Sequence, residues 1–171
     1  MNNKSKRVAF GGVLLALNSL TFILMNMLTV NTVFFMVIAS FFSAMIIIEF
    51  GDGFGLVYSI ATIFMALLII NSKLLAAEYC IIFSLYGFIK GRIEKIGLKT
   101  VTEFIVKLIY ADIALFIMWF IVKYFLPVNL IKGNTAVIMV IGYQFLFILY
   151  DLVYTSFIRY YDEKRKKLGR I

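Results

Sequence analysis

Five charged side chains lie inside long apolar stretches of this sequence, where a charge is costly and usually has a partner or lines a cavity. They are Glu78, Lys107, Asp112, Lys123 and Asp151. Depth in the membrane can be counted at about 1.5 Å of rise per helical residue. By this count Glu78 and Lys123 lie at the same depth in the membrane, and Lys107 and Asp151 lie together at a second depth. We therefore expect two ion pairs, Glu78 with Lys123 and Lys107 with Asp151. Asp112 has no cation at its depth and is expected to be protonated or bonded to a neighbouring helix.

Polar and aromatic residues recur at helical spacing beside these charges. Asp112, Leu115 and Trp119 follow i, i+3, i+7 spacing, which places them on one helix face. On the next predicted helix Gln144 and Asp151 are seven residues apart, and three tyrosines lie near them: Tyr143, Tyr150 and Tyr154. The two faces offer the lining that a small-molecule pocket needs. The alternative interpretation is that these residues bond the helices together and form an interfacial belt.

The chemistry is restricted by what the chain lacks. It contains no His and a single Cys, Cys80. This leaves no disulfide framework, no His/Cys metal cluster and no nucleophile paired with a His. These absences exclude most classes of enzyme, and we expect no metal, no cofactor and no catalytic residues.

The elements that position these residues are predicted to be transmembrane helices. Apolar residues make up 63% of the chain, with 18 Phe and a single Pro, and the mean hydropathy is +1.00, far outside the usage of a soluble domain. A net charge of +8 would suggest nucleic acid in a soluble protein. Here the basic residues flank apolar spans, where anionic lipid headgroups are the natural counter-charge. Membrane lipids are therefore expected partners and nucleic acid is not.

The apolar stretches predict an all-α membrane bundle of six helices in a single domain. The stretch from Val8 to Ile48 carries no charge and is long enough for two crossings of about 20 residues each. Asp52, after Gly51, is expected to cap the third helix. A basic loop is expected from Lys90 to Lys99. The six predicted spans are about residues 8–28, 30–48, 54–70, 74–89, 101–125 and 135–158.

The basic residues predict the orientation of the bundle. Thirteen of the 17 Lys and Arg residues fall at the N-terminus, in the central loop and in the C-terminal tail. Lys and Arg accumulate in cytoplasmic segments, and an even number of spans separates these three clusters. Both termini are therefore predicted to be cytoplasmic. The clusters are Lys4, Lys6 and Arg7; Lys90, Arg92, Lys95 and Lys99; and Arg159, Lys164, Arg165, Lys166, Lys167 and Arg170.

The first helix carries small residues on one side. Gly12 and Ala16 have small-xxx-small spacing and follow Ala9, which lets another helix approach closely. Packing within the bundle and contact with a separate partner are both open interpretations of this face.

This layout resembles the substrate-binding S components of energy-coupling factor (ECF) transporters. The shared features are six spans with both ends inside, a first helix that opens with Lys6-Arg7 and continues with Gly12 and Ala16, and polar and aromatic residues in the external halves. The segments around Gly53 and Gly55 and from Tyr86 to Gly91 also look similar to the family. The very short first external loop differs from the family, in which that loop often closes over the ligand.

The resemblance implies a subunit of the bacterial cytoplasmic membrane that binds a vitamin-like micronutrient from outside. The face of Ala9, Gly12 and Ala16 would dock on a transmembrane coupling subunit, and separate ATPase subunits would supply the energy. This chain has no Gly-x-x-x-x-Gly-Lys-[Ser/Thr] loop for ATP.

In the pocket implied by this resemblance, Glu78 would hold an amine, Lys123 a carboxylate, and Trp119 would stack on the ligand. Four further residues are expected in the pocket or near its mouth: Tyr143, Gln144, Asn31 and Asn134.

Two other classes of function remain open. A non-transporting scaffold, similar to the small six-span rod-shape-determining proteins, would use the same small-residue face and basic loops to hold protein partners. A membrane enzyme acting on lipid-linked substrates would use Asp112 or Asp151 as a base. A carrier subunit should retain a small ligand in detergent, whereas a scaffold should retain proteins and no ligand.

Overall fold

All regular elements of the described chain are helices. The structure is a computed structural model that describes residues 3–28, 30–125 and 133–167. The predicted connection around Pro127, Asn129 and Lys132 lies outside these residues, as does the side chain of Asn134. The helices are α1 (Asn3–Met27), α2 (Thr32–Phe50), α3 (Asp52–Ile69), α4 (Lys73–Glu78), the π-helix η1 (Tyr79–Ser84), α5 (Tyr86–Lys95), α6 (Thr100–Phe125) and α7 (Gly133–Lys167).

Six helical segments are long and apolar enough to cross a membrane, with α4, η1 and α5 together forming the fourth. The prediction of an all-helical chain with six helices long and apolar enough to cross a membrane is therefore confirmed, although some predicted ends were wrong. The fourth segment continues to Lys95, so Lys90 belongs to a helix and not to the basic loop. Helix α7 continues past Ile158 to Lys167, because nothing in that stretch interrupts a helix.

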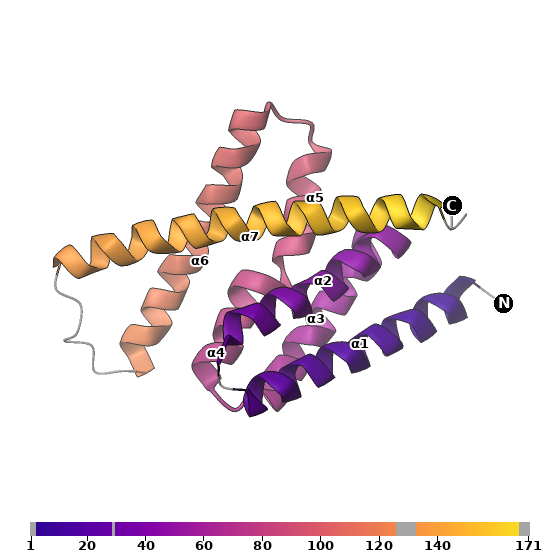
Figure 1. Cartoon of the computed structure of the whole chain (residues 1–171), viewed down its shortest axis with the longest axis horizontal. Helices are drawn as coiled ribbons and strands as arrows, with labels where there is room; N and C mark the ends of the chain where they lie inside the picture. The colour runs from indigo at the N-terminus through magenta and orange to yellow at the C-terminus, as the bar shows by residue number, and fades with distance from the viewer. Residues whose placement is uncertain (1–2, 29, 126–132, 168–171) are drawn as a thin grey trace.

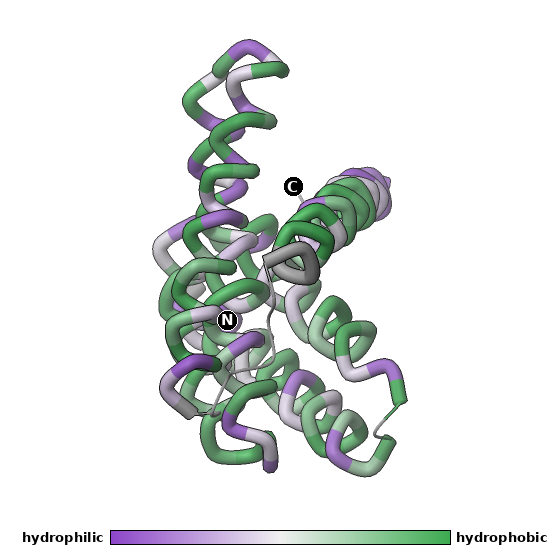
Figure 2. The backbone as a smooth tube through the Cα atoms, turned by 90° about the vertical axis from the view of Figure 1, so that its left-hand side faces the viewer, coloured by the Kyte–Doolittle hydropathy of each residue, from purple (hydrophilic) through white to green (hydrophobic). Residues whose placement is uncertain are grey.

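The helices form two groups that α7 connects (Figure 1). Helices α1, α2 and α3 pack on one another, and α2 also packs against α5 and α7. Helices α5 and α6 form a hairpin at the top of Figure 1, which α7 crosses. The start of α1 and the end of α7 lie on the same side of the molecule in Figure 1. Hydrophobic residues run along the helices, and hydrophilic ones gather at turns such as α5–α6 (Figure 2).

An aromatic core joins the two groups of helices. Tyr86 of α5 is fully buried and makes edge contacts with Phe147 and Tyr154 of α7, at 5.3 and 5.5 Å between ring centroids. Tyr150 and Tyr154 are buried in this core, which agrees with the interpretation that they bond the helices together and not with a pocket lining shared with Gln144. Packing of this kind makes one helix face fit one neighbour.

At two contacts between helices, a side chain of one helix reaches a glycine of the other. A Cβ atom on Gly55 would collide with Ile47 across the α2–α3 contact, and one on Gly87 would collide with the Tyr154 hydroxyl across the α5–α7 contact. The α2–α3 turn also needs glycine, since Gly51 has a φ of 85°.

The expectation that Asp52 caps α3 was wrong. Gly51 occupies the N-cap position, and no side chain caps the helix. The Asp52 carboxylate instead accepts two hydrogen bonds of 2.7 Å from the Lys95 ammonium group. Asp52 therefore ties the α2–α3 turn to the end of α5.

The small residues of α1 face away from the bundle. Ala9, Gly12 and Ala16 are all exposed, and a Cβ on Gly12 would meet no atom within 4 Å. Gly11 is the small residue that packs internally, against the ring of Phe54. The Gly12 face is thus exposed among the described residues, which argues against the internal-packing interpretation.

Candidate functional site

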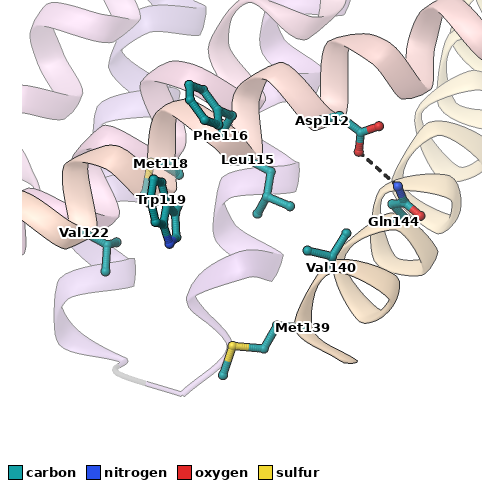
Figure 3. A pocket seen from close by; sticks show the side chains of 9 residues that line it. All are labelled: Asp112, Leu115, Phe116, Met118, Trp119, Val122, Met139, Val140 and Gln144. Carbon is teal, nitrogen blue, oxygen red and sulfur yellow. Dashed lines mark hydrogen bonds between the residues drawn. The ribbon is translucent and has the colours of Figure 1, made fainter. Parts of the chain in front are cut away.

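Helices α6 and α7 border a cleft in the halves that lead to their connection, where the two ribbons diverge in Figure 1. The cavity has a volume of about 510 Å³. Its walls are largely apolar, with polar groups at one end (Figure 3). The lining residues are Asp112, Leu115, Phe116, Met118, Trp119 and Val122 from α6 and Met139, Val140 and Gln144 from α7.

The polar end of the cleft is a hydrogen bond between the two helices. Gln144 Nε2 donates to Asp112 Oδ1 at 3.0 Å, as drawn in Figure 3. The expected bond of Asp112 to a neighbouring helix is therefore confirmed. The Asp112 side chain is exposed, and within the described residues it forms no ion pair.

Trp119 lies toward the other end of the cleft (Figure 3) and is 46% exposed. The Lys123 ammonium group lies over its indole, 5.1 Å from the ring centroid. The prediction that Asp112, Leu115 and Trp119 share one face is confirmed, because all three line the cleft. An aromatic face with a cation on one side is a stacking surface for an apolar or aromatic ligand.

Other predicted pocket residues lie elsewhere. Glu78 does not line the cleft, and no ion pair with Lys123 forms between these described residues, so that expected pair was wrong. The Tyr143 hydroxyl donates to the Ala111 carbonyl at 3.2 Å and so holds α7 against α6. Asn31 is exposed at the start of α2, with a φ of 67° and no side-chain cap, and it is not among the lining residues.

A second polar site joins α5, α6 and α7 at the opposite end of α6. Its centre is Lys90, whose side chain is fully buried. The Lys90 Nζ donates to Asp151 Oδ1 at 2.5 Å and to Thr155 Oγ1 at 2.8 Å. The Tyr86 hydroxyl donates to the same Asp151 oxygen at 2.5 Å. A charge buried in this way is tolerated only when hydrogen-bonded partners surround it.

Lys107 extends this site across α6. Its ammonium group lies 2.6 Å from Glu103 and 2.9 Å from Glu94, and 3.8 Å from Asp151 Oδ2. The predicted pair of Lys107 with Asp151 is therefore confirmed, but it is the longest of the three contacts. Glu94 also lies 2.8 Å from Lys90, which closes a network that we call the charge cluster: Lys90, Glu94, Glu103, Lys107 and Asp151.

The sequence analysis missed most of the charge cluster, because Lys90 and Glu94 fall in the predicted basic loop and Glu103 was not singled out. A signal was available, since Lys90 with Glu94 and Glu103 with Lys107 are both i, i+4 pairs. The described residues hold no group of three or more His, Cys, Asp or Glu side chains suited to a metal ion. The carboxylates of the cluster are occupied by ammonium groups instead.

The two sites differ in what they offer chemically. The charge cluster has its ions paired, and of its members only Glu94 borders a cavity, a smaller one of about 260 Å³ that is lined mainly by α2, α5 and α7. The cleft combines space, apolar walls, an aromatic face and one carboxylate that has no cation among the described residues. In comparisons with known proteins, no protein-family model, no curated protein and no solved structure matches this chain.

Proposed function

We propose that this protein is a membrane-embedded substrate-binding subunit that captures a small molecule in the cleft between α6 and α7. The observation that carries the proposal is the cleft itself, which joins a largely apolar lining to the Asp112–Gln144 pair and the Trp119 ring. Its volume of about 510 Å³ falls within the usual range for small-molecule sites, roughly 300–1,000 Å³. A vitamin-like micronutrient has this size.

The position of the cleft supports capture from outside the cell. It lies in the halves of α6 and α7 that lead to their connection, the side predicted to be external from the distribution of basic residues. We infer that the molecule is taken up across the bacterial cytoplasmic membrane, with both termini of the chain inside.

Transport requires partners, and the exposed face of α1 supports one. Ala9, Gly12 and Ala16 present a shallow surface that is exposed among the described residues, on which a helix of a transmembrane coupling subunit fits closely. Because the sequence has no phosphate-binding loop of the Gly-x-x-x-x-Gly-Lys-[Ser/Thr] type, ATP hydrolysis is assigned to separate ATPase subunits. The chain itself is proposed to be a carrier and not an enzyme.

The test is mass spectrometry of small molecules released when the gently purified protein is denatured. A vitamin-sized compound should be released from the parent protein and depleted in Trp119→Ala. Phe120→Ala is the matched control, because Phe120 is also an exposed aromatic of α6, at 63%, and does not line the cleft. It should release as much as the parent.

The opposite result would favour the scaffold. No compound from the parent, together with no thermal shift from a panel of vitamins, would reject the carrier proposal. Proteins retained through purification and lost in Gly12→Leu would then assign the α1 face to scaffolding.

A further inference from the structure

We propose that the cleft selects an amphiphilic amine in its protonated form, with the ammonium group on Asp112 and the apolar body along the wall toward Trp119. This inference rests on the proposed function, because it names the ligand class of the same cleft. The juxtaposition that carries it is an exposed carboxylate, with no cation among the described residues, at the polar end of an apolar cavity.

The first step compares Asp112 with other carboxylates of the described residues. Most carboxylates that form an ion pair bind a lysine, as Asp52 binds Lys95 and Asp151 binds Lys90. Asp112 has only the neutral amide of Gln144. Glu78 has no ion pair either, but it does not line the cleft. Asp112 is thus the carboxylate that both lacks a positively charged partner among the described residues and borders a space large enough for a ligand.

The second step concerns depth. Asp112 lies at the middle of α6, about 18 Å of helix from either end. A carboxylate at this depth in a membrane is costly unless a partner neutralises it. The Gln144 amide occupies Oδ1, and within the described chain no hydrogen bond is made to Oδ2. An ammonium group bound at Oδ2 would supply both the missing charge and the missing hydrogen bond.

The third step defines the rest of the ligand. Trp119 is seven residues from Asp112, or about 10 Å along the helix, and the side chains between them are apolar. At the far end the Lys123 ammonium lies over the Trp119 ring, so a second positive charge there would be repelled. The ligand is therefore a single cation at one end of an apolar or aromatic body about 10 Å long.

This placement changes the expected roles of two acids. The resemblance implied that Glu78 holds an amine, whereas the structure brings Asp112, and not Glu78, into the cleft with Trp119. Asp112→Asn and Glu78→Gln form a matched pair of variants. Each removes one carboxylate that forms no ion pair within the described residues, Asp112 inside the cleft and Glu78 outside it.

The experiment titrates the full-length protein in lipid nanodiscs with three probes of one shape. They are 4-phenylbutylamine, which is cationic, 4-phenylbutanol, which is neutral, and 4-phenylbutyrate, which is anionic. Binding is followed by the fluorescence of Trp119, the single Trp of the chain, and by calorimetry. The amine should bind at least about thirtyfold more tightly than the alcohol or the acid, the size of effect expected when one partner of a desolvated charge pair is removed.

The variants separate charge recognition from general damage. Asp112→Asn should lose about thirtyfold in amine affinity and retain its affinity for the alcohol, while Glu78→Gln should behave as the parent does. If Asp112→Asn does not fold, the preference of the parent for the amine over the alcohol decides by itself.

Two outcomes would overturn the inference and leave the proposed function standing. One is equal binding of all three probes, or tighter binding of the alcohol, with no effect of Asp112→Asn. The other is the release of a vitamin-sized compound without an amine from the parent protein. If no probe binds and no compound is released, the proposed function fails as well.

Discussion

Helices α6 and α7 meet at two polar sites, and the two are built in opposite ways. In the charge cluster, Lys107 of α6 and Asp151 of α7 share partners with Lys90 of α5, whose side chain is fully buried. In the cleft, Asp112 of α6 meets only the amide of Gln144, and both border an open cavity. The difference indicates that the first site holds the helices together, and it supports the proposal that the second binds a small molecule.

The physical reason lies in the cost of a charge in a poorly polar environment. A buried ion is stable when hydrogen bonds satisfy it, and removing one partner leaves the other uncompensated. Lys90 meets this condition with three oxygen partners, from Asp151, Thr155 and Glu94. Asp112 does not meet it with groups of the described chain, so its carboxylate remains available to a ligand.

The largest expected effect is on the charge cluster. Lys90→Met should destabilise the protein by about 3–5 kcal/mol, because it leaves Asp151 buried without its main cation. Chemical unfolding in detergent measures the loss. Lys95→Met is the matched control, since its side chain is 62% exposed, and it should cost about 1 kcal/mol or less. Equal effects of the two variants would contradict a structural role for the cluster.

A smaller effect is expected at the contact between α5 and α7 beside the cluster. Gly87→Ala would drive a methyl group into the Tyr154 hydroxyl, and overpacking of this kind costs about 1–3 kcal/mol. Gly91 lies one turn further along α5, and a Cβ atom there would meet no atom within 4 Å. The effect of Gly91→Ala on stability should therefore be neutral or slightly favourable. Thermal unfolding of the two variants would show whether α7 is seated as closely as the structure indicates.

The cleft should respond differently from the cluster to loss of a carboxylate. Asp112→Asn should change the free energy of unfolding by less than about 1 kcal/mol without ligand, because an Asn oxygen can still accept from Gln144. Asp151→Asn should cost more, since Lys90 then loses the negative charge to which it is bound at 2.5 Å. Similar losses measured in urea for both variants would remove the distinction between the two sites.

The smallest expected effect concerns the far end of the cleft. Lys123→Met removes the ammonium group above the indole, a contact that contributes roughly 0.5 kcal/mol at an exposed site. Stability should hardly change, but the emission maximum of Trp119 should shift, because a nearby charge acts on the excited indole. Lys99→Met in the α5–α6 turn is the control. An unshifted spectrum for Lys123→Met would contradict the placement of Lys123 over the ring.

Some features of the two sites could be predicted from the sequence. The common depth of Lys107 and Asp151 follows from counting residues along two helices, and the shared face of Asp112, Leu115 and Trp119 follows from the helical period. The shared face depends on one helix alone, and the common depth depends only on how far each residue lies from the end of its own helix. The prediction for Glu78 and Lys123 used the same reasoning and was wrong, because equal depth does not make two helices neighbours at that level.

Lys90 shows that residue type alone does not reveal whether a charged side chain is buried. In the sequence it opens a run of basic residues and is predicted to lie in a loop. In the structure α5 continues through it and turns its ammonium group toward α7. A charged residue at a predicted boundary can therefore be a buried structural ion when an acid on another helix faces it.

The sequence by itself determined that the chain forms six apolar helices, because hydropathy is a local property and a spanning segment must satisfy its own backbone hydrogen bonds. Only the tertiary structure decided which charges meet and where space remains. Those outcomes depend on the rotation and order of the helices, which close contacts such as Gly87 against Tyr154 and the ring packing of Tyr86 determine. The charge cluster and the cleft both follow from how α7 lies across α5 and α6.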